Sequence, residues 1–135
     1  MKREIKQIVT IIIGLFLFLQ SCSNLKFERK DFVGIWEAGD KATVELNEDS
    51  STIIKDIDLS NIFYSKTNET IDFSGKWEFT TDMYKKQVIR INSRKYTFDF
   101  YISGQGTFGN KPPFDLYIFI GDPDEMNKYR FIKQL

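Results

Sequence analysis

The chain contains no histidine and only one cysteine, Cys22. Without histidine there is no Ser-His-Asp triad and no Cys-His pair, and a zinc site built from His or Cys is excluded as well. A single cysteine cannot form a disulfide within the chain. The fold must therefore be stabilised by its hydrophobic core alone, and most hydrolase chemistry is excluded.

Neither sign of charge is in excess, since 19 Lys and Arg residues balance 19 Asp and Glu residues. Nucleic-acid binding depends on clustered cations, so we expect no nucleic-acid partner. Residues Gly104 to Gly109 match the dinucleotide fingerprint by letter, but Asn110 to Pro113 follow and cannot open the helix that the fingerprint requires. We therefore expect no cofactor.

The longest hydrophobic run, from Ile8 to Leu19, follows the basic residues Lys2 and Arg3 and precedes small and polar residues. This order predicts a secretory signal over residues 1–21. An uncleaved transmembrane helix is the alternative. Such a helix needs about 20 apolar residues, and the stretch from Gln7 to Ser21 is shorter.

The four residues Leu19-Gln20-Ser21-Cys22 resemble the lipobox of bacterial lipoproteins. The resemblance implies that Cys22 is acylated and becomes the new N-terminus, with residues 22–30 as a lipidated tether and residues 31–135 as one domain. No run of acidic residues follows Cys22 directly. We therefore expect a lipid-anchored protein of the bacterial cell envelope, on the outer membrane and facing the periplasm.

Aromatic residues make up 16% of the chain and favour sheet over helix. The residues from Tyr96 to Ile102 alternate cleanly, with Tyr96, Phe98, Phe100 and Ile102 on the face that should be buried. Two long loops are predicted, at Asp56–Ser74 and Ser103–Pro113, and a short turn capped by Asp31 precedes the first strand. About eight strands are predicted, at Ile35–Glu37, Ala42–Leu46, Thr52–Lys55, Gly75–Thr80, Gln87–Asn92, Lys95–Ile102, Phe114–Ile120 and Tyr129–Lys133.

A glycine followed two residues later by a tryptophan, at Gly34-Ile35-Trp36, opens this series of strands. The pattern resembles calycins and lipocalins, and the resemblance implies a small antiparallel up-and-down β-barrel. It also implies that Trp36 closes one end of the barrel and that Arg130, on the last strand, packs across Trp36. Four segments resemble a group of small uncharacterised bacterial exported proteins with lipocalin-like folds: Gly34–Trp36, Leu46–Asp49, Gly75–Trp77 and Gly121–Asp124 followed by Tyr129–Phe131.

Two functions fit this architecture. In the first, the barrel holds a small hydrophobic ligand, and Trp36, Trp77, Phe98 and Phe100 line the site. In the second, the barrel is filled by its own side chains. Its loops, chiefly residues 60–74 and 103–113, then bind an envelope protein, as enzyme inhibitors and immunity-type lipoproteins do. A pocket of about 300 Å³ or more would favour the first.

Three carboxylates lie close together in the sequence, at Asp122, Asp124 and Glu125. They could hold a hard cation such as calcium, but Asp followed by Pro is also common in type I turns. We favour the turn and expect no metal. A pair of carboxylates could also serve a glycosidase, but nothing in the sequence places two of them across a cleft. We therefore expect no enzymatic activity.

Overall fold

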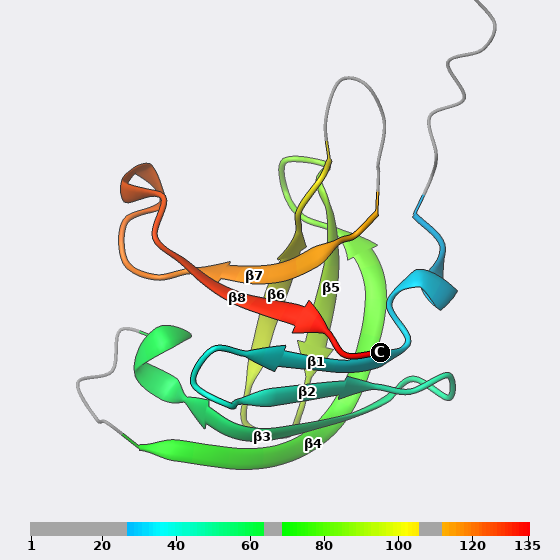
Figure 1. The fold of residues 1–135 in the computed structure, drawn as a ribbon, viewed down its shortest axis with the longest axis horizontal. Coiled ribbons are helices and arrows are strands. Elements are labelled where there is room, and N and C mark those ends of the chain that lie inside the picture. Colours follow the sequence, from blue (N-terminus) through cyan, green and yellow to red (C-terminus); the bar gives the residue numbers. More distant parts are fainter. Residues whose placement is uncertain (1–26, 64–68, 106–111) are drawn as a thin grey trace, which may run out of the picture.

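The computed structural model describes residues 27–63, 69–105 and 112–135. The predicted signal, Cys22 and the inner parts of both predicted loops lie outside these residues. The chain forms eight antiparallel strands that close into one up-and-down barrel, in which each strand pairs with the next and β8 pairs with β1 (Figure 1). The strands are β1 (Gly34–Ala38), β2 (Thr43–Leu46), β3 (Ser51–Asp58), β4 (Thr70–Thr81), β5 (Gln87–Asn92), β6 (Thr97–Ile102), β7 (Asp115–Phe119) and β8 (Lys128–Lys133). The predicted fold class is confirmed.

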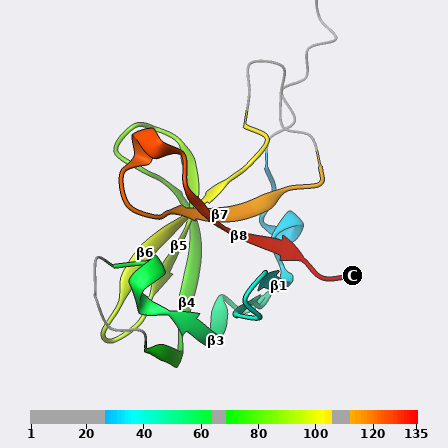
Figure 2. The ribbon, with the colours of Figure 1, turned by 60° about the vertical axis from the view of Figure 1, so that its left-hand side comes forward.

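Up-and-down order gives the barrel two distinct ends. The β2–β3, β4–β5 and β6–β7 connections lie at the same end as the start of β1 and the end of β8. The other four connections lie at the opposite end. We call the first the closed end and the second the mouth. Figures 1 and 2 both place η1 (Arg29–Asp31), a turn of 3-10 helix, beside the start of β1 at the closed end.

The core fills the centre of the barrel. Strand residues alternate between the two sides of the wall, and the inward set is almost wholly apolar. Phe100 packs edge-on against Phe131 with ring centroids 5.2 Å apart, and Phe131 packs against Tyr129 at 4.7 Å. The side chains of Trp36, Val44, Leu46, Ile54, Ile57, Trp77, Ile89, Ile91, Phe100, Leu116 and Phe131 are at most 2% exposed.

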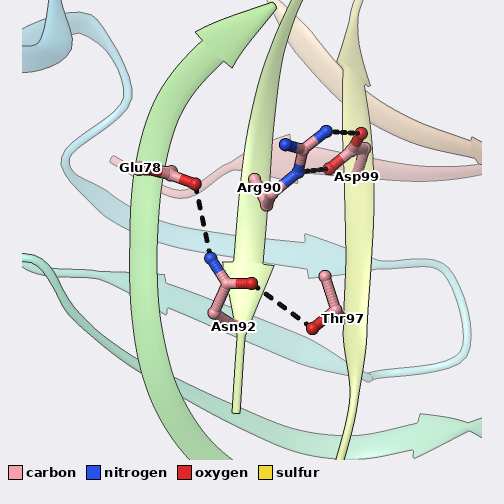
Figure 3. A network of polar contacts seen from close by, with 5 residues as sticks. All are labelled: Glu78, Arg90, Asn92, Thr97 and Asp99. Atoms are coloured by element: carbon pink, nitrogen blue, oxygen red, sulfur yellow. Dashed lines mark hydrogen bonds and ion pairs between the residues drawn. The ribbon is translucent and has the colours of Figure 1, made fainter. Parts of the chain in front are cut away.

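On the outer wall, β5 and β6 are joined by a polar network (Figure 3). Register places Arg90 opposite Asp99, and the guanidinium donates two hydrogen bonds to the carboxylate, at 2.7 and 2.8 Å. The Asp99 carboxylate raises the pKa of Arg90, so the guanidinium stays charged. The side chain of Asn92, also on β5, donates a hydrogen bond to Glu78 on β4 and accepts one from Thr97 on β6. The network fixes the register of three neighbouring strands.

The two Gly-x-Trp segments arise for different physical reasons. Gly34 has a φ of +135°, which favours glycine. At Gly75 the constraint is space, because a Cβ there would lie 2.3 Å from the backbone oxygen of Asn92. The two glycines are therefore required for unrelated reasons.

Most strand bounds differ from the sequence prediction by one or two residues, and three features differ more. Strand β3 continues to Asp58 and β4 begins at Thr70, so the predicted loop between them is much shorter. The turn before β1 is capped by Glu28, whose backbone N–H donates to the Asp31 carboxylate at 2.9 Å. Phe27 is 5% exposed and belongs to the core. Any tether therefore ends before Phe27, and not at residue 30 as predicted. Within the described residues, no helix has the length and apolar character needed to cross a membrane.

Candidate functional site

Trp36 and Trp77 both belong to the closed end. The Trp36 Nε1 donates to the backbone oxygen of Phe32 at 2.8 Å, and the Trp77 Nε1 donates to that of Asn47 at 2.8 Å. Phe32 also packs against Phe27, with ring centroids 5.5 Å apart. A layer of aromatic rings that continues to Phe79 and Phe114 therefore covers this end of the barrel.

The predicted contact between Arg130 and Trp36 is wrong. Register places Lys133 opposite Trp36, whereas Arg130 lies opposite Tyr117 and forms an ion pair with Asp115. The reason is alternation along β8, which turns Arg130 to the outer wall. The Lys133 Nζ lies 5.7 Å from the Trp36 ring centroid and donates to the backbone oxygen of Asp31 at 2.9 Å. A cation does pack across the tryptophan, but it is a lysine three residues further on.

A second cation covers Trp77. The Arg29 guanidinium carbon lies 4.0 Å from the Trp77 ring centroid, and the guanidinium donates to Ser50 Oγ at 2.9 Å and to the backbone oxygen of Glu48 at 3.2 Å. The segment that precedes β1 is thus bound to the barrel by Arg29, Phe27 and Phe32. The predicted tether, residues 22–30, therefore includes residues that pack on the folded domain.

Of the four aromatic residues predicted to line a ligand site, only Phe98 lies near the mouth. Trp36, Trp77 and Phe100 are between 0 and 2% exposed and pack within the core. Phe98 is half-buried and packs against Phe100 with centroids 5.4 Å apart. The structure therefore separates the predicted set. Trp36 lines a cavity of about 410 Å³ at the closed end, and Phe98 lies beside a larger groove at the mouth, which we take as the candidate site.

Three further aromatic side chains surround Phe98 at the mouth. Phe73 lies 5.2 Å from Tyr96 and 6.1 Å from Phe98 by ring centroid. Phe63, which follows the short helix η2 (Leu59–Asn61), stacks on Tyr96 at 5.7 Å. All four rings are half-buried, so they form an aromatic cluster that a ligand can reach.

A groove of about 650 Å³ opens beside this cluster, lined by Ile71, Asp72, Phe73, Ser74, Ser93, Arg94, Lys95 and Tyr96. Its origin is a gap in the sheet. Strand β4 pairs with β5 only from Lys76 onward, whereas Ile71 and Phe73 pair only with β3. The first half of β4 and the β5–β6 turn therefore form two walls with a space between them.

The groove carries more positive than negative charge. Arg94 and Lys95 are exposed on one wall, and among the described residues neither has a carboxylate within 4.0 Å. The one carboxylate of the lining, Asp72, accepts the backbone N–H of Asp56 at 2.8 Å. The lining thus combines the apolar and aromatic side chains of Ile71, Phe73 and Tyr96 with two exposed cations. Such a combination suits a ligand with an apolar body and an acidic group.

Tyr129 stabilises the mouth from the opposite side. Its hydroxyl lies 2.8 and 2.9 Å from the two oxygens of the Asp40 carboxylate in the β1–β2 turn. Burial, together with this hydrogen bond, raises the pKa of Tyr129, so the phenol stays protonated and continues to donate. The contact joins the β1–β2 turn to β8.

The acidic cluster near the C-terminus is a turn. Asp122 caps the short helix η3 (Pro123–Glu125), and its carboxylate accepts the backbone N–H of Asp124 at 2.9 Å. Across residues 27–63, 69–105 and 112–135, no group of three or more Asp, Glu, Cys or His side chains is placed to hold a metal ion.

These features define a small all-β protein whose closed eight-stranded antiparallel barrel is consistent with a lipocalin-like fold. One end is covered by aromatic rings, and the other carries the aromatic cluster and its groove. Comparison with protein-family models, with curated proteins and with solved structures finds no significant match.

Proposed function

We propose that this protein is a lipid-anchored binding protein of the bacterial cell envelope, which holds a small hydrophobic ligand with an acidic group in the groove at the mouth. The observation that carries the proposal is the combination of half-buried Phe73, Tyr96 and Phe98 with the exposed cations Arg94 and Lys95. The volume of the groove exceeds the roughly 300 Å³ that a drug-sized ligand needs.

The chemistry of the two walls sets the pose of the ligand. An apolar chain that lies against Ile71, Phe73 and Tyr96 removes their remaining exposed surface from water, which stabilises the complex. A carboxylate at the outer edge then meets Arg94 and Lys95 and forms charge-assisted hydrogen bonds. In this account the buried core below Phe98 is the rigid base of the site and takes no ligand itself.

The anchor part of the proposal rests on the sequence resemblance around Cys22. Acylation of Cys22 would hold the domain at the membrane surface, where hydrophobic molecules are concentrated. We place the protein on the outer membrane, facing the periplasm. The anchor is tested by the intact mass of the full chain from a bacterial host, which should show residues 1–21 removed and acyl groups added, and by its loss in Cys22→Ser.

Laurate, which has an apolar chain and one carboxylate, is a suitable probe for the groove. We expect a chain that begins at Ser23 to bind laurate, as measured by titration calorimetry. The double variant Arg94→Glu, Lys95→Glu should bind at least about ten-fold more weakly, which corresponds to about 1.4 kcal/mol. Lauryl alcohol, which lacks the charge, should also bind more weakly than laurate.

A matched control is available at the closed end, where Lys85 and Lys86 form another adjacent pair of exposed cations. The variant Lys85→Glu, Lys86→Glu makes the same change in net charge and should bind laurate within about two-fold of the unchanged chain. If both double variants weakened laurate binding equally, the net charge of the protein, and not the position of Arg94 and Lys95, would determine the affinity. The absence of laurate binding in every chain would contradict the proposed ligand.

A second candidate function, binding of a protein partner, is favoured by the outer wall. Tyr101, Tyr117 and Phe119 pack together there with ring centroids 5.3 to 5.7 Å apart. Lys128 Nζ lies 4.3 Å from the Tyr117 centroid. Aromatic residues such as tyrosine and phenylalanine are enriched at protein interfaces. This candidate would become the first choice if no hydrophobic acid bound to the groove.

A further inference from the structure

The turn between β4 and β5 presents two neighbouring apolar side chains to solvent. Met83 is 84% exposed and Tyr84 is 75% exposed. Among the described residues these are the most exposed large hydrophobic side chains apart from the C-terminal Leu135. Lys85 and Lys86 follow directly and are also exposed. Together, Met83, Tyr84, Lys85 and Lys86 form what we call the hairpin tip.

The hairpin tip has a fixed shape. The Asp82 carboxylate accepts the backbone N–H groups of Tyr84 and Lys86 at 2.9 and 2.8 Å, and the Lys85 N–H donates to the Asp82 backbone oxygen at 3.0 Å. These bonds hold the backbone of the turn in place. The exposure of Met83 and Tyr84 is therefore built into the fold.

The hairpin tip also lies at a particular end of the barrel. The β4–β5 connection is at the closed end, where the chain enters the folded domain at Phe27. Phe27 follows Cys22 by five positions in the sequence, and five extended residues span about 17 Å. If Cys22 carries the lipid, Phe27 stays within that distance of the membrane surface, and the closed end is the end of the barrel held near the membrane.

We propose that the hairpin tip is a second membrane contact, which inserts Met83 and Tyr84 into the interface of an anionic lipid surface and so orients the barrel with its mouth away from the membrane. This inference rests on the proposed anchor at Cys22. Tyrosine side chains are enriched at membrane interfaces, and lysines beside them are attracted to anionic headgroups. The contact supplies orientation, while the acyl chains supply the attachment.

The contact can be tested on the full lipidated chain in vesicles of phosphatidylethanolamine and phosphatidylglycerol whose acyl chains carry bromine, which quenches tryptophan on contact. Tyr84→Trp places a reporter at the hairpin tip. Met126→Trp places a matched reporter at the mouth, at a side chain that is 62% exposed in the β7–β8 connection. The unchanged chain gives the background from Trp36 and Trp77. Met83→Trp serves as a second reporter at the tip.

We expect the added emission of Tyr84→Trp and of Met83→Trp to be quenched at least about two-fold, and that of Met126→Trp to be unaffected. Adding Lys85→Glu and Lys86→Glu to Tyr84→Trp should reduce the quenching, and vesicles without phosphatidylglycerol should do the same. Laurate binding should be unchanged in these variants, because the groove lies at the other end.

The outcomes separate the two proposals. If the protein sediments with the vesicles and carries the acyl mass, but both tip reporters remain unquenched, the second contact is overturned and the anchor stands. Equal quenching at Tyr84→Trp and Met126→Trp would overturn the proposed orientation. If Cys22 carries no acyl group and the chain stays in solution, the anchor fails and the inference fails with it.

Discussion

Gly75→Ala is expected to lower the free energy of unfolding by about 3 kcal/mol, the upper part of the range for overpacking in a tight interior. The new Cβ would lie 2.3 Å from the Asn92 backbone oxygen and 3.0 Å from its carbonyl carbon. Backbone atoms cannot rotate away as a side chain can. The contact would therefore push β4 and β5 apart where Lys76 pairs with Asn92. Urea unfolding followed by tryptophan fluorescence measures the loss.

Gly39→Ala is the matched control for this prediction. A Cβ at Gly39 would have no other atom within 4 Å, so the same added methyl group should change the free energy of unfolding by less than about 0.5 kcal/mol. A change at Gly75 as small as that at Gly39 would mean that β4 and β5 do not approach as closely as the register requires.

Trp36→Ala is expected to lower the free energy of unfolding by about 4 kcal/mol, because it leaves a large cavity in the core. Trp36 is 1% exposed, and the substitution also leaves the Phe32 backbone oxygen without the indole N–H and Lys133 without its aromatic partner. A small domain is stable by only about 5–15 kcal/mol. The variant should therefore unfold at a much lower urea concentration, with Trp77 as the remaining fluorescent probe.

Two variants control for the size of the side chain and for its place. Trp36→Phe keeps an aromatic ring in the core. It should lower the free energy of unfolding by less than half as much as Trp36→Ala does. Tyr84→Ala removes a large ring from a site that is 75% exposed and should change stability by less than about 0.5 kcal/mol. A small cost for Trp36→Ala would show that the closed end is not a packed part of the fold.

The barrel was predictable because the strands carry strong local signals. Gln87–Asn92 is predicted and observed with the same bounds, and the alternation from Phe98 to Ile102 correctly gives the inward face of β6. Such patterns follow directly from the two-residue period of a strand. The start of β4 carries the same signal, since Ile71 and Phe73 alternate with Thr70 and Asp72. Because polar residues surround this short stretch, a loop was predicted there instead of a strand.

The site was less predictable because it depends on register. Alternation along β8 turns Arg130 to the outer wall, but it does not say which side chain lies opposite Trp36. Only the pairing of β1 with β8 places Lys133 there. Likewise, Phe63, Phe73 and Tyr96 come from separate segments, and the groove beside Phe73 and Tyr96 exists because β4 diverges from β5 before Lys76. A gap in pairing between distant segments has no local signal.

The central claim is that a hydrophobic acid binds at the mouth and not within the barrel. Intermolecular nuclear Overhauser contacts between bound laurate and the side-chain protons of a chain that begins at Ser23 test it most directly. We predict contacts from the laurate chain to Phe73, Tyr96 and Phe98, and none to the indoles of Trp36 and Trp77. Contacts to either indole, or a bound laurate without contacts to the mouth, would contradict this account.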